Sequence, residues 1–238
     1  MSSRPAGRGE AAARSSGEGE GLAREGLAEH YKRDFWIKEN QKHAPAHYRL
    51  RKSARIINAI VGREDRNLLD VGCGPATLMR LLRPNIRYYG IDMAIRDPAP
   101  NLIETDILEQ PIGFNGQRFD IVTALGVFEY VAGRQEQKFS EISQLLDEHG
   151  RFVLTYTNFG HRDKRIFEAF SNVQSFDDFR QSLAKHFIIE RCFPASYNWH
   201  AGQPVRTLLQ SANMPVKVNI PLIGTRLAVD YFFICSGR

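Results

Sequence analysis

The segment LLDVGCGPATL at residues 68–78 joins a short apolar run to two closely spaced glycines. A continuous apolar run of this kind is typical of a strand buried on both faces of a sheet. Gly72 and Gly74 allow the backbone to turn tightly and to approach a ligand without an intervening Cβ. Pro75 suits the first turn of a helix over TLMRLL, whose free amides can receive an anion. The segment therefore predicts a strand, a turn and a helix that would hold a carboxylate or a pyrophosphate.

Short apolar runs alternate with helical stretches along the chain after residue 67. The runs cover residues 67–71, 86–91, 101–105, 119–124 and 151–156, with two later ones at 187–193 and 227–235. Their apolar character and their alternation with longer connections favour parallel strands. We therefore predict an α/β fold with a doubly wound, mainly parallel seven-stranded sheet.

The N-terminal part differs from this core. Residues 1–21 are rich in Gly, Ser, Ala, Arg and Glu and contain no apolar stretch, which predicts a disordered tail. Two amphipathic helices are expected within residues 22–62, the second over 46–61. The α/β core would then extend over 67–238, so that residues 22–238 form a single domain.

The composition excludes several classes of protein. The 238 residues are 42% apolar and 25% charged, and the net charge of +5 does not by itself imply nucleic-acid binding. No apolar run approaches the roughly 20 residues that cross a bilayer, and the first residues do not resemble a secretory signal. Cys73, Cys192 and Cys235 form no CxxC pair, so a disulfide framework is not expected. These features predict a cytoplasmic, reduced protein without a membrane partner.

Acidic residues stand at the ends of the second and third predicted strands. Asp92 closes IRYYGID, 18 residues after Gly74, where a carboxylate can accept hydrogen bonds from both hydroxyls of a ribose. Asp106 follows the next strand and can accept from an exocyclic amine, while Met93 and Ile107 can flank a flat base. Because the carboxyl ends of parallel strands meet at one edge, these groups predict a nucleoside site there.

Five successive motifs resemble those of the class I S-adenosylmethionine-dependent methyltransferases. They are LLDVGCGPATL, YYGIDM, ETDILEQPI, FDIVTALGVFEYV and HGRFVLTY, and they cover residues 67–156 in order. The resemblance implies a Rossmann-like methyltransferase fold, with an antiparallel last strand and N-terminal helices that form a lid. It also implies S-adenosylmethionine as the cofactor.

The resemblance assigns roles to residues of the predicted cofactor site. The turn with Asp70, Gly72, Cys73 and Gly74 would meet the methionine part of the cofactor. The resemblance implies that the Asp92 carboxylate holds the ribose, that Asp106 reaches the adenine amine and that the segment at Leu125 lies beside the sulfonium.

Two departures from the family pattern are visible in the sequence. Only about nine residues, including Pro98 and Pro100, separate Asp92 from the third predicted strand, so the usual helix there must be short or absent. Where many members carry His after the fourth strand, this chain has Tyr130, which becomes a candidate catalytic side chain.

Two other interpretations of these features are weaker. A dinucleotide-binding site would need a third glycine at position 77, which is Thr77, and the chain has no room for a separate substrate domain. His43 and His47 have the helical spacing of metal ligands, but Pro45 disrupts the helix that would align them. No metal site is predicted.

One further candidate for the cofactor site and two candidate groups for the acceptor lie elsewhere in the chain. Tyr31 is either a core aromatic or a lid residue whose ring faces the sulfonium through a cation–π contact. After the fifth strand, Asn158, His161 and Arg162 could orient the acceptor, or they could belong to a solvated basic helix start. The second acceptor group lies in a predicted loop over 194–204 and consists of Tyr197, Trp199 and His200.

The resulting functional hypothesis is methyl transfer to a small-molecule acceptor, with His161 or His200 as general base where that acceptor is a hydroxyl. An RNA or protein methyltransferase remains an alternative, supported only by the net charge and the HRDKR cluster at 161–165. The other alternative is a catalytically silent methyltransferase fold that acts as a binding subunit.

Overall fold

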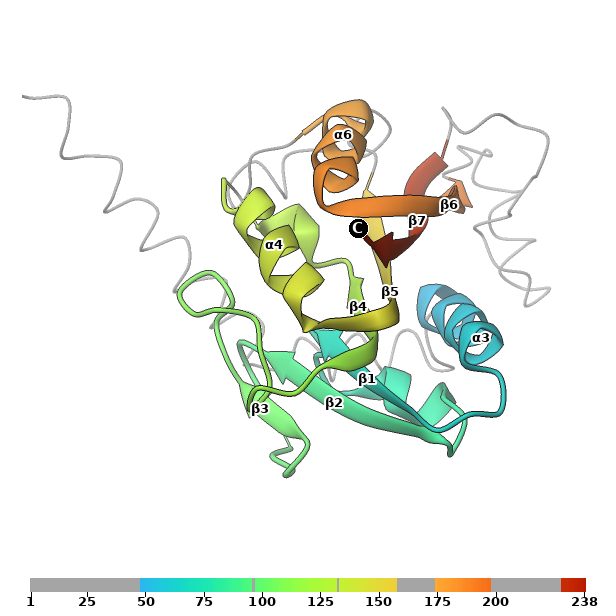
Figure 1. The fold of residues 1–238 in the computed structure, drawn as a ribbon, viewed down its shortest axis with the longest axis vertical. Coiled ribbons are helices and arrows are strands. Elements are labelled where there is room, and N and C mark those ends of the chain that lie inside the picture. Colours follow the sequence, from blue (N-terminus) through green and yellow to red (C-terminus); the bar gives the residue numbers. More distant parts are fainter. Residues whose placement is uncertain (1–47, 96, 132, 158–173, 198–227) are drawn as a thin grey trace, which may run out of the picture.

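The computed structural model describes residues 48–95, 97–131, 133–157, 174–197 and 228–238. Their strands form one seven-stranded sheet in the order β3-β2-β1-β4-β5-β7-β6 (Figure 1). The strands are β1 (Arg66–Val71), β2 (Ile86–Asp92), β3 (Leu102–Glu104), β4 (Phe119–Leu125), β5 (Leu146–Thr157), β6 (Phe187–Tyr197) and β7 (Ala228–Gly237). The helices are α3 (Tyr48–Val61), η1 (Thr77–Leu81), η2 (Phe128–Tyr130), α4 (Gln135–Leu145) and α6 (Phe176–His186).

Strand direction confirms the predicted sheet. β1 pairs in parallel with β2 and β4, β3 pairs in parallel with β2, and β5 pairs in parallel with β4. Only β7 runs antiparallel to its neighbours β5 and β6. The strand order reverses at the step from β1 to β4, and the carboxyl ends of strands at such a switch point open a crevice for a ligand.

Helices cover both faces of the sheet, as a doubly wound fold requires (Figure 1). On one face, α3 buries Ala54, Ile57 and Val61 against Leu68 of β1 and Phe232 of β7. This helix occupies most of the second predicted N-terminal helix.

On the opposite face, α4 and α6 form an aromatic core with the sheet. The Phe139 ring of α4 stacks on Phe128 with ring centroids 4.6 Å apart, and both rings make edge contacts with Phe152. Phe179 of α6 stacks on Tyr156 with ring centroids 3.6 Å apart. Ser175 caps the start of α6, because its hydroxyl accepts a hydrogen bond from the backbone N–H of Asp178 at 3.1 Å. The two faces together bury the apolar runs that the sequence shows.

The helix predicted after the glycine-rich turn is wrong in extent. Residues Thr77–Leu81 form only a single 3₁₀ turn, and the chain is extended at Leu82. Pro84 disfavours helical backbone at Arg83, so too few residues remain for an α-helix before β2 begins at Ile86. Between β2 and β3 the described residues also contain no helix, as the short proline-containing connection predicts.

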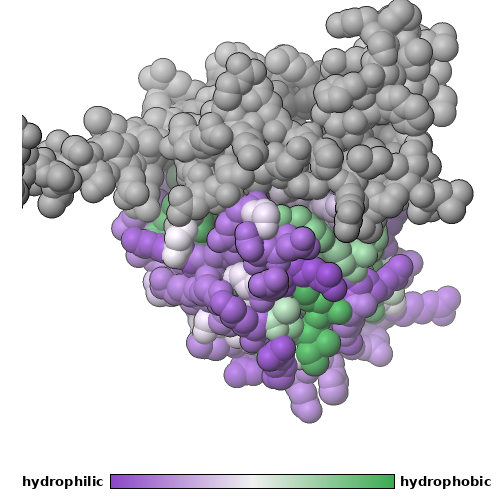
Figure 2. All heavy atoms as spheres, turned by 90° about the horizontal axis from the view of Figure 1, so that it is seen from above, coloured by the Kyte–Doolittle hydropathy of each residue, from purple (hydrophilic) through white to green (hydrophobic). Residues whose placement is uncertain are grey.

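The described surface is largely hydrophilic, with a limited hydrophobic area in the view of Figure 2. The large apolar side chains that are exposed among the described residues are Ile60, Met79 and Ile188. None of the helices in the described part of the chain is long and apolar enough to cross a membrane.

Candidate functional site

The glycine-rich turn after β1 has a left-handed backbone at three alternate residues. Gly72, Gly74 and Ala76 have φ angles of 71°, 52° and 51°. The backbone N–H groups of Gly72 and Cys73 both donate to the carbonyl of Ile91, at 2.8 and 3.1 Å, which ties the turn to the end of β2. The turn therefore lies at the carboxyl edge of β1 and β2, as the sequence predicts.

The space around Gly72 restricts this position to glycine, as its φ angle also does. A Cβ at Gly72 would lie 2.4 Å from Cγ2 of Val127, which follows β4. Only glycine combines this φ angle with this close approach. The contact also brings the segment after β4 directly against the turn, so β1, β2 and β4 all contribute to one site.

Asp92 ends β2 and its carboxylate bonds to the glycine-rich turn. Oδ2 accepts from the backbone N–H of Gly74 at 2.8 Å, and Oδ1 accepts from that of Ala94 at 3.0 Å. Burial raises the pKa of Asp92, the two backbone hydrogen bonds act in the opposite direction, and the charge of Glu104 raises it further. Because a carboxylate offers about four acceptor positions, this partly exposed group retains capacity to accept from a further ligand.

Asp70 lies in the interior beneath the turn. Its side chain is 3% exposed, and its Oδ2 accepts a hydrogen bond from the Tyr88 hydroxyl at 2.6 Å. Burial raises the pKa of Asp70 to about 7, against the lowering effect of the Tyr88 hydrogen bond, and the charge of Asp92 adds to the rise. Asp70 and Tyr88 thus form a buried polar support for the residues that reach the edge.

Cys73 also packs inward. A Cβ on Gly90 would lie 2.8 Å from the Cys73 Sγ, so this thiol fills the space that the missing side chain of Gly90 leaves. Burial raises the pKa of the Cys73 thiol, with further increases from the charges of Asp70 and Asp92. The group is therefore a protonated packing element with low nucleophilicity.

The loop after β3 carries the predicted base-binding residues. The Asp106 Oδ1 accepts from the backbone N–H of Leu108 at 2.8 Å, and its carbonyl accepts from those of Glu109 and Gln110 at 3.1 and 2.9 Å. Ile107 is partly buried against the core on the α4 and α6 side. Asp106 thus shapes its own turn next to the end of β3.

The remaining predicted cofactor residues follow the same strands. Met93 comes directly after Asp92 and is partly exposed, and Leu125 is the buried last residue of β4. Tyr130 lies in η2, where its backbone N–H donates to the Val127 carbonyl at 2.9 Å and its side chain packs against the α4 and α6 core.

A second group of polar side chains at this edge escaped the sequence analysis. The Thr157 hydroxyl at the end of β5 lies 3.0 Å from Oε1 of Glu129 and 3.0 Å from Oδ1 of Asp230. Both carboxyl side chains are 4% exposed. One hydroxyl carries one hydrogen, so Thr157 can donate to only one carboxylate, and the second contact is a hydrogen bond when the other carboxyl is protonated. The sequence signal for this group is Asp230, which is an isolated acidic residue in the apolar run LAVDYFFIC.

Several predicted residues lie outside the described part of the chain. They are Tyr31, Asn158, His161, Arg162, Trp199 and His200. Tyr197 is the last residue of β6 and pairs with Ala228 of β7. The loop predicted from residue 194 is therefore wrong in its first part, because the pairing with β7 continues the strand through a register shift.

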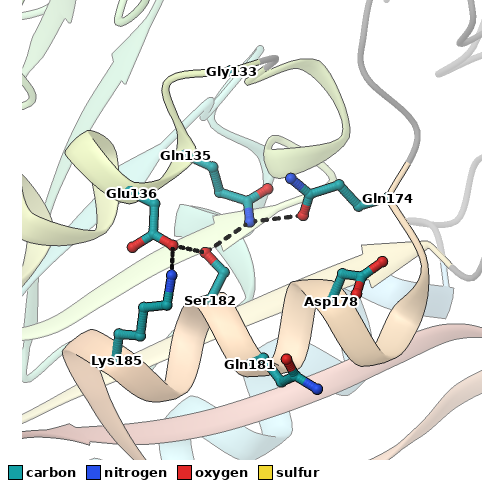
Figure 3. Close-up of a pocket in the computed structure, with 8 residues that line it drawn as sticks. All are labelled: Gly133, Gln135, Glu136, Gln174, Asp178, Gln181, Ser182 and Lys185. Atoms are coloured by element: carbon teal, nitrogen blue, oxygen red, sulfur yellow. Dashed lines mark hydrogen bonds and ion pairs between the residues drawn. The ribbon is translucent and has the colours of Figure 1, made fainter.

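A polar pocket of about 260 Å³ lies between the first turn of α4 and α6 (Figure 3). There Gln135 Nε2 donates to Gln174 Oε1 and Ser182 Oγ at 3.1 and 3.2 Å, and Ser182 Oγ donates to Glu136 Oε1 at 3.0 Å. Lys185 Nζ donates to the same Glu136 oxygen at 2.6 Å. These side chains form hydrogen bonds with one another between α4 and α6. The pocket therefore belongs to the packing of these two helices and is not the candidate cofactor site.

Within the described ranges, no three His, Cys, Asp or Glu side chains are grouped so that they could hold a metal ion. The polar groups that the described residues place at the carboxyl edge are carboxylates, backbone N–H groups and hydroxyls.

Similar solved structures share this architecture. A TehB-like SAM-dependent methyltransferase from Corynebacterium glutamicum has 16% identity and a TM-score of 0.58, covering 90% of this chain and 100% of its own. The plantazolicin methyltransferase BpumL, solved with SAH and a monoazolic desmethylPZN analog, has 13% identity and a TM-score of 0.60, covering 93% and 96%. The methyltransferase in a complex with the Haloferax volcanii Trm112 activator has 16% identity and a TM-score of 0.58, covering 87% and 96%.

The sequence itself identifies the family. No curated protein matches it significantly. A family model described as a methyltransferase domain matches residues 45–193, which is more than half of the chain and includes the strands β1 to β5. The chain therefore belongs to the methyltransferase-domain family, as an S-adenosylmethionine-dependent enzyme of class I.

Proposed function

We propose that the enzyme methylates a small-molecule acceptor and that the residues predicted from the sequence hold its cofactor. The observation that carries the cofactor assignment is the Asp92 carboxylate, which two backbone N–H groups fix at the edge while part of it stays accessible. Its remaining lone pairs can accept hydrogen bonds from the two hydroxyls of a ribose. Each such charge-assisted hydrogen bond contributes about 1.5–3 kcal/mol to binding. The hydrogen-bonding groups of this edge therefore fit a nucleoside sulfonium.

The other residues of the edge complete this assignment. The turn at Gly72 and Gly74 offers close backbone approach to the methionine part, and Asp106 with Ile107 and Met93 would hold the adenine. Bound S-adenosylmethionine supplies the electrophilic methyl group. The task of the protein is to align the acceptor with that methyl and to exclude water, and such alignment can supply roughly 7–11 kcal/mol of the barrier.

The acceptor side of the proposal rests on Glu129, Thr157 and Asp230. Glu129 lies in η2 after β4, Thr157 is the last residue of β5 and Asp230 lies near the start of β7. Glu129 follows Val127 by two residues, so the group adjoins the segment at Leu125 and Val127 that would border the sulfonium. Buried acids suit a small polar acceptor and disfavour a phosphate backbone, whose recognition requires Lys and Arg. BpumL, a fold relative, was solved with a monoazolic desmethylPZN analog and SAH.

We propose the remaining acceptor contacts from the sequence alone. His161 and His200 are the candidate general bases for a hydroxyl acceptor, and Tyr130 is a further candidate catalytic group. Asn158, Arg162, Tyr197 and Trp199 would orient the acceptor, and Tyr31 would cover the sulfonium as part of the lid.

The experiment combines binding with product analysis. Isothermal titration with S-adenosylmethionine and S-adenosylhomocysteine tests the cofactor site. Incubation with methyl-labelled S-adenosylmethionine then tests three separate fractions of a cell extract: small metabolites, RNA and protein. We expect label in the small metabolites, and much less label at the same cofactor concentration when Asp92 is replaced by Ala. Label in RNA or protein would refute the small-molecule proposal, and binding without labelling of any fraction would favour a silent binding subunit.

A further inference from the structure

The loop between β3 and β4 carries the proposed adenine-binding residues without a helix to fix it. Residues 105–118 form turns and irregular backbone. Its far part is anchored by Ile112 and Phe114, each 4% exposed, with the Phe114 ring in edge contact with Tyr89 at 4.9 Å. Nearer to Asp106, Ile107 and Leu108 are only partly buried against the same core, so side-chain hydrogen bonds add to the contacts that hold this part of the loop.

Lys138 of α4 supplies one of these contacts from the interior. Its side chain is 1% exposed, and Nζ donates to the backbone carbonyl of Gln110 at 3.0 Å. The same Nζ donates to both carboxylate oxygens of Glu141, at 3.0 and 2.8 Å. An ammonium has three hydrogens, so these three acceptors use its full donor capacity.

Glu141 supplies the second contact, one helical turn along α4. Its Oε2 accepts from the backbone N–H of Ile112 at 2.9 Å. The ion pair thus bonds to the loop on both sides of Pro111, at the Gln110 carbonyl and at the Ile112 amide. The Gln110 N–H donates to the Asp106 carbonyl at 2.9 Å, so Lys138 is two hydrogen bonds away from Asp106.

Stability alone does not account for a buried ion pair at this place. Apolar side chains of similar volume often stabilise a core as well as a buried pair does, because the pair loses its hydration. Apolar side chains cannot, however, hold a carbonyl and an amide in fixed directions. From this geometry we propose that Lys138 and Glu141 are positioning residues for the adenine end of the cofactor, acting through residues 106–112. The inference rests on the proposed cofactor site.

The test removes both charges together in the full-length protein. Lys138→Met with Glu141→Met leaves no uncompensated buried charge, so the thermal midpoint should stay within a few degrees of that of the wild type. The affinities for S-adenosylhomocysteine and for 5′-methylthioadenosine, which keeps the adenosine half, should both fall about tenfold, as expected when a fixed acceptor moves. The matched control is Glu136→Gln with Lys185→Gln, which removes another ion pair of α4 and should leave both affinities unchanged.

A double-mutant cycle with Asp106→Ala separates positioning from a general loss of structure. If the ion pair acts through Asp106, the combined variant should lose much less affinity than the product of the separate losses. Independent, multiplicative losses would overturn the inference, as would affinities of the charge-free variant within about twofold of wild type, below the expected coupling.

Two further outcomes are also decisive. If the double variant shows no cooperative thermal transition, Glu141→Gln replaces it, because the amide keeps the size and one acceptor oxygen, and the same comparisons apply. A wild-type protein that binds neither ligand would overturn the proposed cofactor site, and the inference with it. A wild type that binds both while the variant binds equally well would overturn the inference alone.

Discussion

Replacement of Gly72 by Ala tests the closest packing at the candidate cofactor turn. The substitution has two separate costs in this structure. A φ angle of 71° costs a residue with a Cβ about 1–2 kcal/mol. The overlap at 2.4 Å with Cγ2 of Val127 adds about 1–3 kcal/mol of overpacking. Alanine also lowers the conformational entropy of the unfolded chain, which stabilises the folded protein by about 0.4–1 kcal/mol. The net expectation is a loss of roughly 1–5 kcal/mol in the free energy of unfolding.

Val127→Ala separates the two costs. This change removes both γ-methyl groups and leaves the Val127 Cβ at 3.6 Å from the added methyl, an ordinary contact distance. In the Val127→Ala background, Gly72→Ala should therefore cost only the backbone part, about 1 kcal/mol after the unfolded-state gain. The difference between the two backgrounds is the steric part, about 1–3 kcal/mol.

Urea unfolding of the wild type, the two single variants and the double variant measures this cycle. Additive losses in the double variant would show that the Val127 methyl group does not oppose a side chain at position 72. A single Gly72→Ala variant that loses less than about 0.5 kcal/mol would refute both the steric and the backbone argument. Circular dichroism of the folded proteins controls for a change of fold.

Three further perturbations follow from the carboxylates. Asp92→Asn removes the charge that accepts from Gly74 N–H, so affinity for S-adenosylhomocysteine should fall about tenfold by titration calorimetry, and an unchanged affinity would contradict the assigned role. Asp70 has a folded-state pKa of about 7 against an ordinary 3.8. The folded protein therefore holds this proton more tightly, and the free energy of unfolding should fall as pH rises from about 4 to 7. Asp70→Asn should flatten that slope in urea titrations at pH 5 and 8. The hydrogen bond from Lys185 lowers the pKa of Glu136 to about 2, so the stability advantage over Glu136→Gln should be present above about pH 4.5 and disappear toward pH 2 in thermal scans. Solvent exposure keeps that difference below about 1 kcal/mol.

The sheet and the cofactor edge could be predicted because their residues carry local information. Strands buried on both faces appear as continuous apolar runs, and β1, β2 and β4 lie within a residue or two of the predicted segments. Asp92 is the last residue of β2 and Asp106 lies two residues after β3, so the parallel topology brings both to the same edge as Gly72.

Contacts between distant segments could not be predicted in the same way. Thr157 meets Glu129 and Asp230 across 28 and 73 residues of sequence, and no local pattern states which strand is the neighbour of which. Lys138 is a polar residue of an amphipathic helix and would ordinarily be assigned to the solvent face. Its burial depends on the acceptors that Gln110 and Glu141 offer in three dimensions.

Single polar side chains hold the connections after β1 and after β3, where the described chain has no α-helix. After the glycine-rich turn, Asn58 of α3 donates from Nδ2 to the Leu81 carbonyl at 3.2 Å and accepts at Oδ1 from the Arg83 amide at 3.0 Å. After β3, Lys138 and Glu141 bond to a carbonyl and an amide of the loop in the same manner. A helix distributes such bonds over every residue, whereas here each connection depends on one or two side chains. Truncation of these few residues should therefore disturb the two connections more than truncation of the exposed residues around them.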